Sequence, residues 1–250
     1  MNFVKQIPNL LTLGNLLCGS IAAILAVQAD FIGAALFVVI GIILDFFDGF
    51  AARLLNVAGE LGKQLDSLAD MVTSGLVPGI IMVKLMQINL FNKAEFVENN
   101  TIDGVFDNTV LGYSLIGLII TLGACYRLGK FNLDTRQTDF FIGLPTPAMS
   151  LFVVSLPLIQ ANTDFVFVQS LIGNNYFLIA LTWILSFLMN AEINLFSLKL
   201  KDYSFKKNWL IYLFLTFSLV LILLINYLAI PIIIIFYVVL STVKNLTPKI

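Results

Sequence analysis

The stretch that decides how this chain is organised runs from Asp45 to Asp70 and reads DFFDGFAARLLNVAGELGKQLDSLAD. Apolar runs of membrane-spanning length flank it on both sides. Asp45 and Asp48 are three residues apart, which places them on one face of a helix. Gly62, Asp66 and Asp70 follow in a second row spaced by four. Two helix ends are therefore expected to point paired carboxylates into one shared space.

The cost of these aspartates points to a function. An aspartate at the centre of a membrane helix costs about 2.5–3.5 kcal/mol on insertion scales. Carboxylates that lie close together also repel one another unless a cation sits among them. A bound divalent metal is the simplest compensation, and oxygen ligands suit Mg²⁺, Mn²⁺ or Ca²⁺ rather than zinc. A structural role stays open for any single aspartate, as a helix cap or as the partner of Arg53.

The composition is that of a polytopic membrane protein. Of the 250 residues, 59% are hydrophobic and 12% are charged, and the mean hydropathy is +0.97. The net charge of −1 provides no basic field for nucleic acid. The chain has no histidine, so a general base must be a carboxylate, Lys, Tyr or Cys. This again favours the aspartates.

Hydropathy predicts an all-α transmembrane bundle of about eight spans. The expected spans cover roughly residues 10–27, 31–55, 62–88, 110–128, 147–159, 176–189, 209–227 and 231–243. With the N-terminus in the cytoplasm, every Lys and Arg except Lys84 and Lys93 falls on the cytoplasmic side or in the segments bordering it. The sequence therefore predicts that both termini and the aspartate motif face the cytoplasm.

The chain is expected to consist of two parts. Residues 1–190 would form the catalytic core of about six helices, and residues 191–250 would add a basic cytoplasmic loop and a transmembrane hairpin. The loop holds the lysines between Lys199 and Lys207, whose expected role is orientation and attraction to anionic lipid.

The spacing around the aspartates is specific. It is Asp45-x2-Asp48-Gly49-x2-Ala52-Arg53-x8-Gly62-x3-Asp66-x3-Asp70. This pattern resembles the signature of the CDP-alcohol phosphatidyltransferases at every defined position, and the resemblance extends over roughly residues 5 to 190. It implies a multi-pass enzyme of the cell (inner) membrane with a divalent-metal site. Such an enzyme moves a phosphatidyl group from a CDP-linked lipid to a small alcohol and releases CMP.

The resemblance also implies roles for individual residues. Divalent ions, two in the expected arrangement, would be held by Asp45, Asp48, Asp66 and Asp70. Asp70 would in addition be the general base that takes the proton of the acceptor hydroxyl. CDP-diacylglycerol would be bound by Asn9, Thr12, Asp48, Gly49, Ala52, Arg53, Gly62 and Asp66.

Simpler interpretations of some of these residues stay open. Asn9 and Thr12 also suit an interfacial turn before the first span, where Pro8 favours a helix start. The glycines also suit close helix packing. Arg53 would pair with either an aspartate or a phosphate.

A second informative stretch follows the fourth expected span and reads YRLGKFN at residues 126–132 and FIGLPTP at residues 141–147. It resembles a segment of the phosphatidylserine synthases in the same family, with Lys130 where arginine is usual. The resemblance implies L-serine as the acceptor, bound by Arg127, Lys130 and Asn132. Arg127 is the better carboxylate clamp, because lysine lacks a planar fork. Basic residues retained only for orientation are the alternative.

Several alternatives remain at this level. Glycerol phosphate, inositol phosphate and choline are competing acceptors. An aspartate-rich membrane prenyltransferase and a cation transporter are rival classes of protein. Expected partners are CDP-diacylglycerol, L-serine, membrane lipids and, as one arrangement, a second copy in a homodimer, but no nucleic acid.

Overall fold

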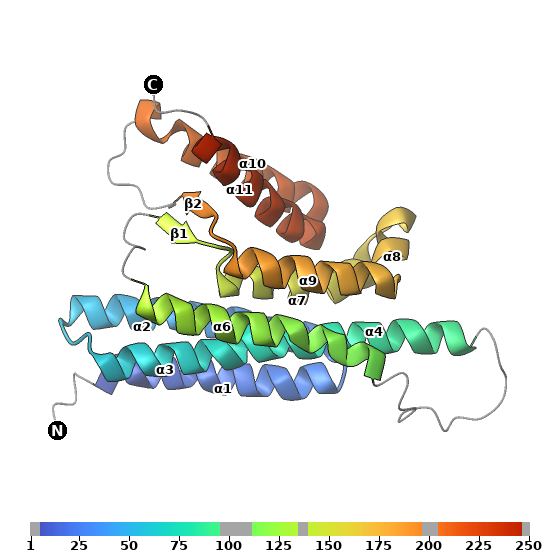
Figure 1. The fold of residues 1–250 in the computed structure, drawn as a ribbon, viewed down its shortest axis with the longest axis horizontal. Coiled ribbons are helices and arrows are strands. Elements are labelled where there is room, and N and C mark those ends of the chain that lie inside the picture. The colour runs from blue at the N-terminus through green and yellow to red at the C-terminus, as the bar shows by residue number, and fades with distance from the viewer. Residues whose placement is uncertain (1–5, 96–111, 135–139, 197–204, 247–250) are drawn as a thin grey trace.

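The structure is a computed structural model that describes residues 6–95, 112–134, 140–196 and 205–246, and helices dominate it (Figure 1). The expected helical bundle is therefore confirmed. In chain order the elements are α1 Ile7–Val27, α2 Phe31–Leu54, α3 Glu60–Asp70, the π-helix η2 Met71–Leu76, α4 Val77–Glu95, the 3₁₀-helix η4 Leu115–Leu118, α6 Ile119–Leu133, β1 Phe140–Ile142, α7 Thr146–Asn162, α8 Val166–Ile172, α9 Asn175–Asn190, β2 Asn194–Phe196, α10 Phe205–Ile225, the 3₁₀-helix η5 Asn226–Leu228 and α11 Ala229–Leu246.

The eight expected spans are not confirmed. By length and composition, five helical stretches in the described part of the chain suit a membrane span, or six if α8 and α9 form one span bent by 73°. The helix α7 has 17 residues and α9 has 16, which is short for a hydrocarbon core about 30 Å thick. The stretch Asn208–Asn245 counts once among these five, although it contains both α10 and α11. The chain reverses at η5 between them, since the ring of Phe214 in α10 stacks on that of Phe236 in α11 at 6.2 Å.

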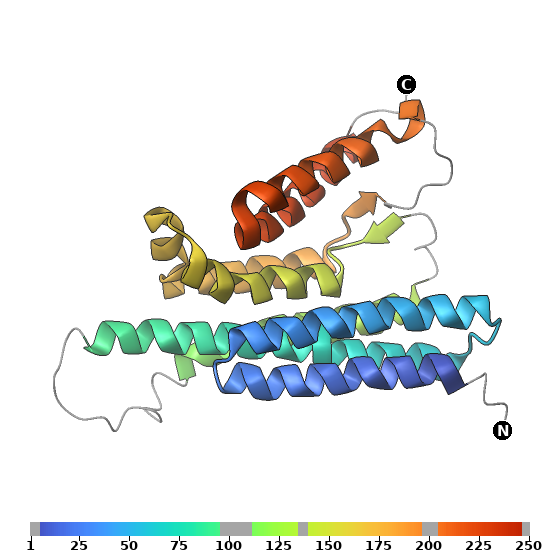
Figure 2. The same cartoon turned by 180° about the vertical axis from the view of Figure 1, so that it is seen from behind.

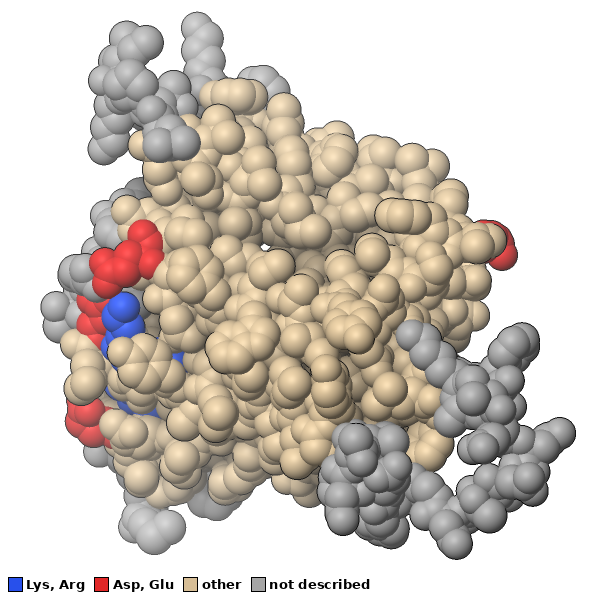
Figure 3. Space-filling model, turned by 45° about the vertical axis from the view of Figure 1, so that its right-hand side comes forward, with Lys and Arg blue, Asp and Glu red and all other residues tan. Residues whose placement is uncertain are grey.

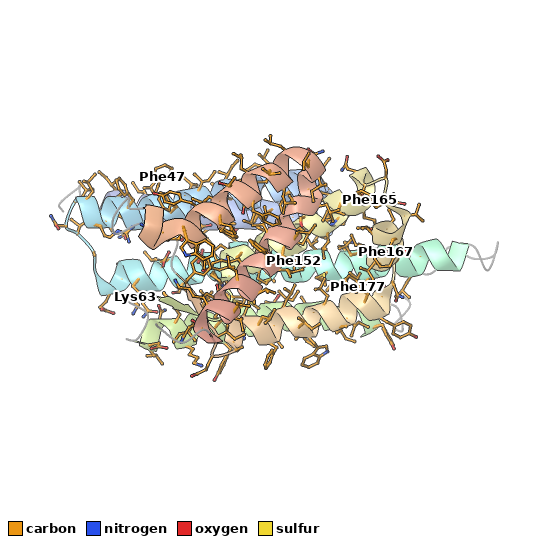
Figure 4. All side chains as sticks on the ribbon, turned by 90° about the horizontal axis from the view of Figure 1, so that it is seen from above. Phe47, Lys63, Phe152, Phe165, Phe167 and Phe177 are labelled. Atoms are coloured by element: carbon orange, nitrogen blue, oxygen red, sulfur yellow. The ribbon has the colours of Figure 1, made fainter. Side chains whose placement is uncertain are left out.

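The helices form layers (Figures 1 and 2). The helices α1, α2, α3, α4 and α6 run side by side, α7 and α9 lie above them, and the hairpin of α10 and α11 covers the outer side. The middle layer is the most enclosed, since residues 152–159 of α7 are all buried. Figure 4 shows Phe152 of α7 projecting beneath the hairpin, whereas Phe47 of α2 points away from the bundle.

Close packing of small residues holds α1 and α2 against η2. A Cβ on Gly19 would lie 2.9 Å from Cα of Thr73, and a Cβ on Gly41 would lie 2.8 Å from Cγ2 of the same threonine. The Thr73 hydroxyl donates to the Asn15 carbonyl at 3.1 Å. The π-helix begins directly after Asp70, and such local widenings are frequent at functional sites. The backbone around Asp70 is thereby fixed against α1.

Charged side chains gather at one end of the bundle. Figure 3 shows acidic and basic groups along one edge and a broad face without charged groups beside it, with a further acidic group at the opposite edge. Lys63 marks this end in Figure 4, close to the turn between α2 and α3. The basic loop expected between Lys199 and Lys207 lies outside the residues whose side chains are described.

A two-stranded sheet at the same end was not expected. The strands β1 and β2 are antiparallel, with Phe140 opposite Phe196 and Ile142 opposite Asn194. The Gly143 N–H donates to the Ile193 carbonyl at 2.9 Å and extends the pairing. Three-residue strands have too little periodicity to be predicted from sequence. Their pairing ties the segment after α6 to the segment after α9.

Candidate metal and nucleotide site

Three carboxylates meet where α2 ends and α3 begins. Asp45 and Asp48 come from the last turns of α2, and Asp66 comes from α3. One carboxylate oxygen from each lies within 4.8 Å of the others. Oδ1 of Asp45 is buried and has no hydrogen-bond partner in the described part of the chain. A buried carboxylate oxygen without a partner is costly, and a hard divalent cation is the partner it suits. These residues therefore fit a metal of the Mg²⁺ or Mn²⁺ type.

The first helix fixes one member of this group. The Thr12 hydroxyl of α1 donates to Oδ2 of Asp48, whose residue is only 5% exposed. One oxygen of Asp48 is thus held by the protein, and the orientation of the carboxylate is set. This arrangement matches the support that metal-binding carboxylates commonly receive from neighbouring groups.

A cavity of about 550 Å³ opens beside the three aspartates. This volume is within the usual range for small-molecule sites. All eight residues expected to bind the CDP-lipid line it, namely Asn9, Thr12, Asp48, Gly49, Ala52, Arg53, Gly62 and Asp66. The structure therefore brings residues from α1, α2 and α3 together around one space.

The two motif glycines face this cavity rather than a helix contact. A Cβ on Gly62 would approach only Asn9 Oδ1, at an ordinary 3.5 Å, and one on Gly49 would lie 4.0 Å from Arg53 Nη2. Packing within the protein does not require glycine at either position. Arg53 is exposed and makes no ion pair with an aspartate among the described residues. The interpretations of tight packing and of an Arg53–aspartate pair are thus not supported.

Asp70 lies outside the group of three carboxylates, although its charge interacts with theirs. It does not line the cavity, it is 9% exposed, and its Oδ1 accepts a hydrogen bond from Asn15 Nδ2 at 3.2 Å. The last turn of α3 carries Asp70 deeper along α1 than Asp66. Of the four expected metal ligands, three thus form one cluster that lines the cavity, and Asp70 lies outside this cluster but interacts electrostatically with it.

Asn15 was missed by the sequence reasoning. It is fully buried and faces Asp70, and its own Oδ1 is buried without a partner in the described residues. The sequence did contain a signal for Asn15, because Asn9, Thr12 and Asn15 are spaced by three and share one face of α1.

Arg127 is a cationic neighbour of Asp70. It is 7% exposed, and it interacts electrostatically with Asp70. Its Nη1 donates to the Thr146 hydroxyl at 3.3 Å, while its Nε is buried with no partner among the described residues. A buried guanidinium with an unused N–H is suited to bind a carboxylate through two parallel hydrogen bonds.

The other two residues expected to bind the acceptor point elsewhere. Lys130 Nζ pairs with Glu192 at 3.1 Å. The Asn132 side-chain amide donates to the Ser67 hydroxyl at 2.8 Å, and the backbone carbonyl of Asn132 accepts from Lys63 Nζ at 2.7 Å. The cavity that Arg127 shares with Lys130 measures only about 10 Å³, which holds about one water. In the described part of the chain, the cavity beside Arg127 and Lys130 is therefore too small for serine, and Asn132 does not line it.

Comparisons with known proteins agree with this site. The profile of the CDP-alcohol phosphatidyltransferase family matches residues 5–188. A CDP-diacylglycerol--serine O-phosphatidyltransferase of Bacillus subtilis is 34% identical over 61% of this chain and 76% of its own length. One of Helicobacter pylori is 31% identical over 66% of this chain, and the chain spans 62% of that relative. An archaetidylserine synthase of Methanothermobacter thermautotrophicus is 26% identical over 60% of this chain and 56% of its own length.

Proposed function

The chain belongs to the CDP-alcohol phosphatidyltransferase family, and we propose that it transfers the phosphatidyl group of CDP-diacylglycerol to L-serine. The products are phosphatidylserine and CMP. The observation that supports this most directly is that every residue of the expected nucleotide site lines one cavity beside three clustered carboxylates. Membership of this family excludes the two rival classes of protein, the membrane prenyltransferase and the cation transporter.

The donor is held on the aspartate side of the site. Asp45, Asp48 and Asp66 would hold the divalent ions, which when bound neutralise pyrophosphate oxygens and favour departure of CMP. Arg53 is free to meet a phosphate, and Gly49 and Gly62 leave room for the donor to approach closely. Thr12 keeps the Asp48 carboxylate in place. The diacyl tail stays in the bilayer.

The acceptor is held on the other side, between Asp70 and Arg127. Arg127 binds the serine carboxylate with its unused Nε and a neighbouring N–H. Asp70, oriented by Asn15, takes the proton of the serine hydroxyl. The serine oxygen then forms a bond to the phosphatidyl phosphorus, and the bond from that phosphorus to the CMP oxygen breaks. Lys130 and Asn132 act in this proposal as structural contacts of α6.

The same proposal covers topology and organisation. Arg53, Lys63, Arg127 and Lys130 lie at the end that holds the site, which supports a cytoplasmic active site and cytoplasmic termini in the inner membrane. The family match to residues 5–188 supports a catalytic core at residues 1–190 and an additional unit at residues 191–250. Formation of a homodimer stays a prediction.

An acceptor panel tests the proposed function. The purified protein is given CDP-diacylglycerol with Mn²⁺ or Mg²⁺ and, separately, serine, glycerol phosphate, inositol phosphate or choline. We expect CMP release and a lipid product with serine alone. Turnover with another alcohol and none with serine would reject the acceptor, and no CMP release with any alcohol would reject the reaction.

A further inference from the structure

The hairpin of α10 and α11 and the strand β2 both lie beyond the residues matched by the family, and α11 is bonded directly to β2. The Tyr237 hydroxyl donates to the Phe196 carbonyl at 2.7 Å, and Asn245 Nδ2 donates to the Asn194 carbonyl. Lys244 Nζ lies 5.3 Å from the centroid of the Phe196 ring. One helix of the hairpin therefore holds both ends of a three-residue strand.

An aromatic cluster makes this attachment specific. The Phe196 ring lies 5.1 Å from Tyr237 and 6.3 Å from Phe214, both in edge-on geometry. Phe236 in turn stacks on Phe214 and packs at 4.5 Å against Phe217. Aromatic pairs prefer such defined geometries, whereas lipid-facing side chains do not select a partner. The last residue of β2 is thus part of the hairpin's own core.

The strand β2 bridges the hairpin and β1. Carbonyl groups alternate in direction along a strand, so those of Ile193 and Leu195 point to one edge and those of Asn194 and Phe196 to the other. The first edge pairs with β1 and with the Gly143 N–H, and the second accepts from α11. A displacement of α11 would therefore be transmitted through β2 to Gly143.

From Gly143 the connection reaches Arg127. Gly143 has a φ of +72°, a conformation that favours glycine, and a Cβ there would lie 3.1 Å from the Ala191 carbonyl oxygen. The Leu144 N–H donates to the Leu188 carbonyl at 2.9 Å. Two residues later, Thr146 accepts the hydrogen bond of Arg127. The start of α7, and with it the guanidinium, is thus placed by this strand connection.

We propose that Tyr237 and Asn245 are positioning residues for the acceptor side of the site, acting through β2 on Thr146 and Arg127. The inference rests on the proposed binding of serine by Arg127. It predicts a selective effect, because the donor cavity is lined by residues 6–66 alone, none of which belongs to β1, β2 or the hairpin.

The test uses variants that remove only the two hydrogen bonds. Tyr237→Phe keeps the ring, and Asn245→Leu keeps the approximate volume; they are studied singly and combined. Tyr227→Phe is the matched control, since Tyr227 lies in η5 at the other end of the hairpin. For each lost bond we expect the serine KM to rise about 2- to 10-fold, with the CDP-diacylglycerol KM unchanged. Asn245→Gln keeps an amide donor and is expected to recover part of the serine affinity.

Hydrogen exchange tests the same proposal without an activity measurement. Hydrogen exchange of the Gly143 and Leu144 amides should become faster in the double variant and stay unchanged in Tyr227→Phe. An unchanged serine KM in folded double variant, or equal rises in KM for both substrates, would overturn the proposal. If the unaltered protein does not use serine, the proposed function fails, and the exchange data decide the positioning role alone. Unchanged protection of both amides would then reject it.

Discussion

The donor side and the acceptor side of the site differ in how far the protein already satisfies their polar groups. On the donor side, Asp45 has an unpartnered oxygen, Arg53 is exposed, and an open cavity of about 550 Å³ adjoins them. On the acceptor side, Lys130 is paired with Glu192 and only about 10 Å³ is open beside Arg127. The donor side is thus shaped for a large ligand, whereas the acceptor side offers few unused groups to a small one.

This difference indicates how the ligand-binding residues can be identified on each side. Where many polar groups face open space, a shared role in binding is the economical explanation. Where most are partnered, the exceptions identify the ligand contacts, and among the described residues these exceptions include the Oδ1 of Asn15, which neighbours Asp70, and the Nε of Arg127. The Oδ1 of Asn190, which lines the small cavity beside Arg127, is a further one. The predictions below separate the two sides.

The largest effect is expected for Asp70→Asn. The amide keeps the shape and the contact with Asn15 but cannot accept the serine proton, so turnover should fall about 10²–10⁴-fold. Binding of CDP-diacylglycerol should be largely retained, because Asp70 does not line the donor cavity. Both quantities are measured on the purified protein. Asp164→Asn is the matched control, since Asp164 is exposed between α7 and α8. Near-normal turnover in Asp70→Asn would assign the base to another residue.

A smaller, selective effect is expected for Arg127→Ala. Loss of a charge-assisted contact of about 1.5–3 kcal/mol corresponds to a serine KM raised roughly 10- to 150-fold. The KM for CDP-diacylglycerol should change much less. Lys130→Ala is the comparison on the same helix, and its serine KM should change less than about threefold, because its pair with Glu192 is solvent-exposed. Equal increases in the serine KM of Arg127→Ala and Lys130→Ala would contradict a special role of Arg127 in serine binding.

Two glycine substitutions separate packing from binding. Gly41→Ala would place a methyl group 2.8 Å from both Asn15 Oδ1 and Thr73 Cγ2, and such overpacking costs about 1–3 kcal/mol. Thermal unfolding in detergent should therefore shift to lower temperature. Gly62→Ala enters open space and should leave stability unchanged while weakening CDP-lipid binding a few-fold. A destabilised Gly62→Ala protein would mean that this glycine serves helix packing after all.

The donor side could be predicted from sequence because its residues are close in the chain. Asp45, Asp48 and Asp66 lie on two consecutive helices, and helical spacing alone orients them toward each other. Neither the contact of Asp70 with Asn15 nor the π-helix that follows Asp70 could be predicted, since the first depends on how α1 packs on α3 and the second departs from regular helical spacing. A regular helix would have been the default expectation there.

The acceptor side depends on contacts between distant segments, which a single sequence does not specify. Arg127 meets Thr146 across the β1 segment, and Lys130 meets Glu192 only after the three further helices α7, α8 and α9. The resemblance of residues 126–132 to the phosphatidylserine synthases therefore implied one shared role for residues that the fold directs to different partners. The hairpin was foreseen as an added unit, but its bonds to β2 arise from a strand too short to leave a pattern.

Binding of Mn²⁺ tests the central claim most directly, namely that the three clustered aspartates form a divalent-metal site. Free and bound Mn²⁺ are measured by electron paramagnetic resonance during titration of the unaltered protein and of a variant with Asp45→Asn, Asp48→Asn and Asp66→Asn combined. We predict saturable binding by the unaltered protein and its loss in the variant, with folding checked by helical circular dichroism. Equal Mn²⁺ binding by the two folded proteins would contradict the account.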